Sequence, residues 1–122
     1  MSVKNKKIVI RFMSDFIEGK DKAYMKILSD NIKWNIVGMP LIYGKQNFIE
    51  AMGSMGLLSI PSNEKMKPID KVKNVVAESD FVVVENSGKN SKSCSCDVYK
   101  IKNGKIEELT SYIVDTSVNE EC

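Results

Sequence analysis

The sequence predicts one α+β domain in which three helices pack on one face of a curved, mostly antiparallel sheet. The first half of the 122-residue chain shows helical apolar spacing with one embedded strand, whereas the second half alternates apolar and polar residues. An Asn103–Gly104 pair also lies between two strand-like arms, which is a hairpin signal. Helices followed by a run of strands are typical of the α+β class.

Three helices are expected in the first half. The first covers residues 5–18, where apolar residues form a broad stripe and Gly19 supplies a stop. The second is short and takes Asp21 as its N-cap. The third follows the turn at residues 39–44, and its apolar face is formed by Phe48, Ile49, Met52 and Met55.

The strands are predicted from two-residue alternation. Residues 32–38, IKWNIVG, set Ile32, Trp34 and Ile36 against polar neighbours. Further strands are expected at roughly 68–78, at 81–86, and on the two sides of Asn103–Gly104. Residues 57–67 contain Pro61 and no sustained period, so they are expected to form a loop.

Composition excludes several partners. Eighteen basic residues against 16 acidic ones leave a formal charge of +2, and the lysines are scattered, so no nucleic acid is expected as a partner. No segment approaches the roughly 20 apolar residues of a membrane span, and no secretory h-region forms at the start. A single domain at 1–122, no membrane and a cytoplasmic location are expected.

The cysteines do not indicate a disulfide framework or a metal site. There are three, Cys94, Cys96 and Cys122, and the first two lie on one face of a predicted strand. The chain has no histidine, so a zinc site would lack ligands. We expect reduced thiols, no metal and no cofactor.

Three strings give the chain a family resemblance: LSDNIKWNIVG, YGKQNFIEAM and CDVYKIKNGKIEELTSYIVD. Their order resembles the nuclear transport factor 2-like (NTF2-like) superfamily, especially its SnoaL-like polyketide cyclase branch and ketosteroid isomerase. The resemblance implies a cystatin-like cone, in which the sheet wraps around a pocket for a small-molecule ligand and the helices cap it. It also implies a homodimer formed through the outer face of the sheet.

When the catalytic residues of ketosteroid isomerase are matched one by one to this sequence, the set is incomplete. The general-base aspartate of ketosteroid isomerase falls on Ile36, and its oxyanion-hole tyrosine falls on or near Phe12. Only the second, protonated aspartate has a counterpart, Asp97. Because Ile36 and Phe12 can neither accept nor donate a proton, the sequence argues against steroid isomerisation. Members that use histidine, or an aspartate with an arginine, also lack a match, since the sole arginine is Arg11.

Asp97 is the candidate catalytic residue. It is either a solvated or hydrogen-bonded strand residue, or an inward-facing carboxyl group whose pKa is raised by burial. Ser95 and Tyr99 share its face by alternation. The register of the family adds the inward residues Val82, Val84, Asn86, Trp34 and Ile36.

The hairpin leaves two registers open. A two-residue turn would pair Ile101 with Ile106 and bring Thr110 and Tyr112 onto the Asp97 face. A three-residue loop with Gly104 in a bulge would shift the register by one residue. The family resemblance favours this second register, which we predict, and it would instead bring Leu109, Ser111 and Ile113 onto that face.

Three functions follow from this pattern. The first is a cofactor-independent isomerase or cyclase acting on a small apolar carbonyl compound, with Trp34, Asn86 and Ser95 as orienting donors. The second is a non-catalytic ligand-binding or protein-interaction module of the same fold, and the third is a structural homodimer with a filled cone. The outer face carries Val83, Cys96 and Val98 between charges, which favours a dimer. The predicted ligand-binding residues are Trp34, Ile36, Asn86, Ser95, Tyr99 and Ile113.

Overall fold

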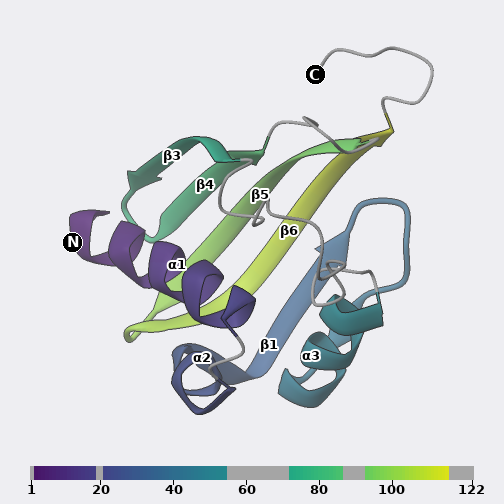
Figure 1. Cartoon of the computed structure of the whole chain (residues 1–122), viewed down its shortest axis with the longest axis horizontal. Helices are drawn as coiled ribbons and strands as arrows, with labels where there is room; N and C mark the ends of the chain where they lie inside the picture. Colours follow the sequence, from purple (N-terminus) through teal and green to yellow (C-terminus); the bar gives the residue numbers. More distant parts are fainter. Residues whose placement is uncertain (1, 19–20, 55–71, 87–92, 116–122) are drawn as a thin grey trace.

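The computed structural model describes residues 2–18, 21–54, 72–86 and 93–115 (Figure 1). In this part of the chain, helices α1 and α2 precede β1, and α3 follows the short strand β2. Four further strands complete one sheet. The bounds are α1 Ser2–Ile17, α2 Asp21–Ile27, β1 Leu28–Ile36, β2 Ile42–Tyr43, α3 Lys45–Ser54, β3 Val72–Glu78, β4 Phe81–Asn86, β5 Ser93–Lys102 and β6 Lys105–Asp115.

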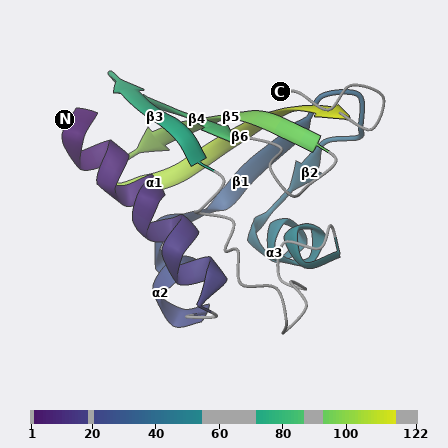
Figure 2. The same cartoon turned by 45° about the horizontal axis from the view of Figure 1, so that its top comes forward.

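The sheet has the order β2-β1-β6-β5-β4-β3. Only β1 and β6 pair in parallel, and every other neighbouring pair is antiparallel. Figure 2 shows the three helices on one side of the curved sheet. Helix α1 packs against β3 and β4, and α3 packs against β1 and β2. The two central strands, β5 and β6, therefore run between the strands that α1 and α3 cover.

An aromatic cluster joins the helices to the inner face of the sheet. Phe12 of α1 is buried, and its ring centroid lies 6.2 Å from that of Phe48 on α3 and 6.4 Å from that of Tyr99 on β5. Phe48 in turn packs against Trp34 of β1, with the two ring centroids 5.1 Å apart. Large aromatic side chains contribute much of the burial in a small core. This cluster fixes the helices over one end of the inner face.

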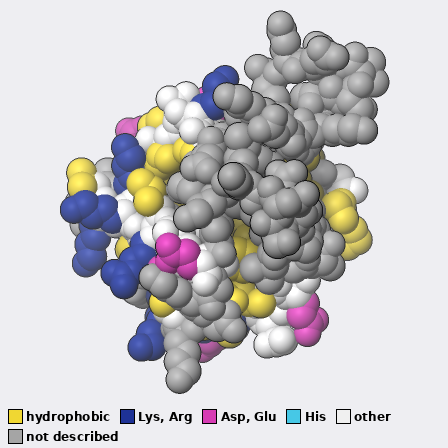
Figure 3. All heavy atoms as spheres, viewed as in Figure 1, with side chains coloured by type: hydrophobic (Ala, Val, Ile, Leu, Met, Phe, Trp, Pro, Cys, Tyr) yellow, Lys and Arg dark blue, Asp and Glu magenta, His cyan; other side chains and the backbone are white. Residues whose placement is uncertain are grey.

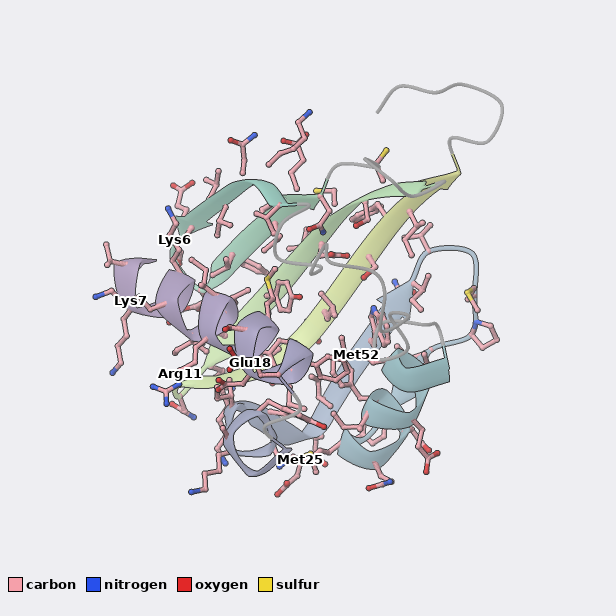
Figure 4. All side chains as sticks on the ribbon, in the orientation of Figure 1. Lys6, Lys7, Arg11, Glu18, Met25 and Met52 are labelled. Carbon is pink, nitrogen blue, oxygen red and sulfur yellow. The ribbon has the colours of Figure 1, made fainter. Side chains whose placement is uncertain are left out.

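The outer side of α1 is charged. Figure 3 shows Lys and Arg side chains along the edge of the molecule where α1 lies, and Figure 4 shows Lys7 and Arg11 projecting from that helix. Val9, Phe12 and Phe16 on its other side are buried, so α1 is amphipathic. Among the described helices, none has the length and apolar character needed to span a membrane.

Most predicted elements are present, with differences at their edges. The three helices and the strands around Trp34, at 81–86 and beside Asn103–Gly104 are confirmed. Strand β1 begins at Leu28, so residues 28–31 add to the start of the strand predicted at 32–38. The two-residue strand β2 was not predicted and lies within the expected turn. The predicted loop at 57–67 lies outside the described residues.

The β5–β6 hairpin combines parts of both predicted registers. Asn103 and Gly104 have φ values of 53° and 77°, and Ile101 pairs with Ile106, so the turn has two residues. The predicted three-residue loop is therefore wrong. The register then shifts beyond Ile101, because Lys100 pairs with Glu108 and leaves Glu107 as a bulge. The predicted face is confirmed, since Leu109, Ser111 and Ile113 are opposite Tyr99, Asp97 and Ser95.

Candidate functional site

The inner face of the sheet changes from apolar to polar along β5. Three successive rows of cross-strand neighbours describe it. The first row is apolar apart from the polar ends of Trp34 and Tyr99, the second contains Asp97, and the third contains Ser95 and Asn86. The rows are Trp34, Leu109, Tyr99, Val82 and Ala77; then Ile36, Ser111, Asp97, Val84 and Val75; then Ile113, Ser95, Asn86 and Val72.

Burial follows the same direction. Tyr99 and Leu109 in the first row are buried, as are Ser111 and Val84 on either side of Asp97. Asp97, Ser95 and Asn86 are half-buried, and Ile113 is 46% exposed. Asp97 therefore lies where the packed apolar core gives way to a polar rim.

Asn86 is one of three polar partners of Asp97. Its Nδ2 donates to Asp97 Oδ2 at 2.9 Å and to Ser95 Oγ at 3.1 Å. Because Asn86, Ser95 and Asp97 come from two adjacent strands in register, the sheet pairing itself brings the three groups together. The side chains of Ser95 and Ser111 also form hydrogen bonds with the Asp97 carboxyl group.

Trp34 extends this network into the core. Its indole Nε1 donates to Ser111 Oγ at 2.9 Å, and both residues are buried. Ser111 thus accepts a hydrogen bond from Trp34 and is also hydrogen-bonded to Asp97. We name the five residues Trp34, Asn86, Ser95, Asp97 and Ser111 the polar cluster.

Burial and hydrogen bonding act in opposite directions on Asp97. Desolvation raises the pKa of its carboxyl group, and hydrogen bonds from Ser111, Asn86 and Ser95 partly oppose this rise. The net effect is a pKa above the ordinary value of 3.8. Burial raises the pKa of the Tyr99 phenol still further from its usual range, with a smaller contribution from Asp97, so this group remains neutral.

The structure brings together the predicted polar residues but changes the role of one of them. Asp97, Asn86 and Ser95 form direct contacts, and Tyr99 and Ile36 lie on the same inner face. Trp34 was expected to orient a ligand as a donor, but its N–H already donates to Ser111. Trp34 is therefore a structural member of the cluster.

Ser111 is the residue that the predicted site list omitted. It is buried and links Trp34 to Asp97. Sequence alternation brings Ser111 to this face only when the extra residue of the bulge is counted, and the bulge position is not visible in the sequence. The predicted register included Ser111 without showing its two partners.

Neither Cys94 nor Cys96 forms a disulfide bond in this structure. Cys96 pairs with Glu85 and Tyr112 and belongs to the outer face. Desolvation, with the charges of Asp97 and Glu85, raises the pKa of the Cys96 thiol and makes it a weak nucleophile. Within the described residues, no group of three or more cysteine, aspartate or glutamate side chains could hold a metal ion.

Solved structures with the same architecture are numerous, although neither a protein-family model nor a curated protein matches the chain. Bal32a, from a soil-derived mobile gene cassette, is 18% identical with a TM-score of 0.75, covering 93% of this chain and 92% of its own. An NTF2-like protein from Burkholderia xenovorans LB400 is 16% identical with a TM-score of 0.73 and the same coverages.

A third solved structure, a candidate ketosteroid isomerase from Kribbella flavida DSM 17836, is 9% identical with a TM-score of 0.73. It covers 93% of this chain and 80% of its own. Identities this low show the fold alone. The chain therefore has the NTF2-like α+β fold, as its sequence predicted.

Replacing Ser111 by alanine tests the link between Trp34 and Asp97. The change leaves a buried indole N–H without its acceptor, so the free energy of unfolding should fall by about 1–3 kcal/mol. Denaturant unfolding followed by the fluorescence of Trp34, the sole tryptophan, measures this. Thr110→Val on the outer face is the matched control and should change stability by less than about 0.5 kcal/mol. Equal effects of both changes would contradict the assignment.

The raised pKa of Asp97 predicts a pH-dependent stability. Between the unfolded-state and folded-state pKa values the folded chain binds more protons, so the free energy of unfolding falls as pH rises from about 4. Asp97→Asn should remove this fall. Ser111→Ala removes one hydrogen bond to the carboxylate and should extend the fall to higher pH. Unfolding curves at several pH values measure both, and an unchanged slope in Asp97→Asn would refute the prediction.

Proposed function

We propose that the protein binds a small, largely apolar molecule on the inner face of its sheet, with Asp97 as the polar anchor. The observation that carries the proposal is a carboxyl group and its neutral hydrogen-bonding partners at the edge of an otherwise apolar face. A mostly apolar surface with a few convergent polar groups is the usual composition of a small-molecule site.

A purely structural role explains this arrangement less well. Burying a carboxyl group without a charge partner costs free energy, and apolar residues at the same position would avoid that cost. Val84 and Ile36, which lie in the same row as Asp97, are such residues. Carboxyl groups whose pKa is raised by burial are found disproportionately at functional sites. The half-buried positions of Asp97, Asn86 and Ser95 also leave part of each side chain accessible.

Similarity to solved structures of this fold supports the same proposal at a coarser level. One of them is described as a candidate ketosteroid isomerase. The sequence strings add a resemblance to the SnoaL-like branch. The remaining predicted members of the site, Ile36, Tyr99 and Ile113, would supply apolar contact area around the polar cluster.

Catalysis is a second candidate function. A carboxyl group with a raised pKa is suited to general acid or base work near neutral pH, so Asp97 could serve a cofactor-independent isomerase or cyclase. The positions that correspond to the isomerase's base and oxyanion-hole tyrosine are Ile36 and Phe12, and both are buried and apolar. Among the described residues of the second and third rows, Asp97 is the only ionisable group, so any reaction there would depend on it. Binding without turnover requires no second catalytic group.

A thermal-shift screen with small apolar carbonyl compounds, alcohols and amines, coupled to product analysis, tests both candidates. A bound compound should raise the melting temperature of the wild type, and Asp97→Asn should reduce that rise. If a product forms, Asp97→Asn should lower its rate by at least about 100-fold. Glu85→Gln, a matched carboxylate change on the outer face of β4, should leave both readouts unchanged. A screen without hits would refute the binding proposal.

The outer face of the sheet supports a further proposal, a homodimer. This face exposes Val76, Phe81 and Tyr112, which are 60%, 46% and 49% exposed, and Val83 and Val98 lie between them on β4 and β5. Apolar side chains gathered on an exposed sheet face are more often part of an interaction surface than a solvated one. A second copy would cover it with the same residues, as in a two-fold symmetric interface.

Tyr112→Asp tests the dimer. A charge introduced at an exposed position of the interface would face its symmetry mate or apolar side chains, and the dimer should dissociate. Sedimentation at micromolar concentration is the measurement, with the wild type expected as a dimer. Val3→Asp, at a 67% exposed apolar position on α1, is the control and should leave the dimer intact. A monomeric wild type would refute the interface.

A further inference from the structure

The N–H and O–H hydrogen atoms of the polar cluster are already used in hydrogen bonds between its own members. Both Nδ2 hydrogens of Asn86 are used, one on Ser95 Oγ and one on Asp97 Oδ2. The Trp34 indole hydrogen is used on Ser111. Because an ionised carboxylate only accepts, the hydroxyl hydrogens of Ser95 and Ser111 are used in their bonds to Asp97.

The hydrogen-bonding positions of the cluster that remain unused are acceptors. A carboxylate offers about four lone-pair sites, and the cluster fills three of those of Asp97. Asn86 Oδ1 accepts from no residue in the described ranges. Tyr99, which also carries a hydroxyl group, is only 4% exposed, so it offers little to a molecule at the rim. A molecule that meets this cluster would therefore find oxygen acceptors and few donors.

The charge of the site is also unbalanced. Three donors converge on Asp97, an arrangement that complements the ionised form. Within the described residues, no lysine or arginine forms an ion pair with Asp97. Its cross-strand neighbours are Val84 and Ser111, and its titratable neighbours are Tyr99 and Cys96, which burial favours in their neutral forms. A ligand that supplies a positive charge would gain both a hydrogen bond and charge neutralisation in a site of low polarity.

We propose that the ligand of this site is a protonated amine on a small apolar body, with its N–H groups donating to Asp97 and Asn86 Oδ1. This inference rests on the proposed function, because it names the chemical class of the molecule bound there. It differs from the carbonyl compound that the family resemblance implies. A carbonyl oxygen accepts, and the cluster has little left to donate to it.

Three probes with one carbon skeleton separate these classes: α-methylbenzylamine, α-methylbenzyl alcohol and acetophenone. They offer an ammonium donor, a hydroxyl that both donates and accepts, and a carbonyl acceptor. The indole N–H signal of Trp34 in a proton–nitrogen NMR spectrum reports binding at Asp97. The indole N–H donates a hydrogen bond to Ser111, and Ser111 is hydrogen-bonded to Asp97. Titrations of the wild type, Asp97→Asn and Glu85→Gln give the affinities.

The amine should bind at least about tenfold more tightly than acetophenone, with the alcohol between them. Its affinity should rise as the pH increases from about 4 and Asp97 ionises. Asp97→Asn should lower the amine affinity by about tenfold or more, whereas Glu85→Gln should not change it. The wild-type probe order and pH trend remain decisive if Asp97→Asn fails to fold.

Two outcomes would overturn the inference in different ways. Acetophenone binding most tightly, or binding that improves as pH falls, would show a site that donates to its ligand, and the proposed small-molecule site would stand without the amine. If none of the probes shifts the Trp34 signal at any pH, both the amine assignment and the binding site on this face are refuted.

Discussion

The candidate site depends on one extra residue in β6. Glu107 bulges between the turn at Asn103–Gly104 and the pairing of Lys100 with Glu108. Because side chains alternate along a strand, continuous pairing from the same turn would bring Thr110 and Tyr112 opposite the inner residues of β5. The bulge instead turns Ser111 inward beside Asp97 and within reach of Trp34. Without it, the indole N–H and the carboxyl group would lose the hydroxyl that joins them.

A second constraint comes from how the helices cover the sheet. Helix α1 packs on β3 and β4, and α3 packs on β1 and β2, while Phe12 and Phe48 fill the core beside Trp34 and Tyr99. The aromatic cluster therefore lies next to the first row of the inner face, and Asp97 lies one row further along. Its desolvation and its remaining exposure both follow from this position, and so does its raised pKa.

The sequence was informative where local chemistry decides the structure. Helical spacing in α1 and α3, the alternation around Trp34 and the Asn103–Gly104 turn were sufficient to predict the α+β fold and the inward face of Asp97. It was uninformative where distant pairing decides. The site of the bulge reflects how β6 must meet both β5 and β1, and the bond between Trp34 and Ser111 spans 77 residues. Neither has a local signature, so the sequence did not indicate that the Trp34 N–H donates to Ser111.

The hydrogen-bond inventory also limits what Asp97 can do in a reaction. As an acid it would have to be protonated, and the proton would occupy one of the acceptor positions of the carboxyl group, three of which already receive hydrogen bonds from Ser95, Asn86 and Ser111. As a base it would act from the form that these three donors favour, although their bonds also reduce its basicity. The hydrogen bonds of the cluster stabilise the ionised carboxylate, whereas burial destabilises it. A bound cationic group would offset the cost of burying this charge without any proton transfer. An anchor for an amine therefore follows more directly from this geometry than a catalytic acid.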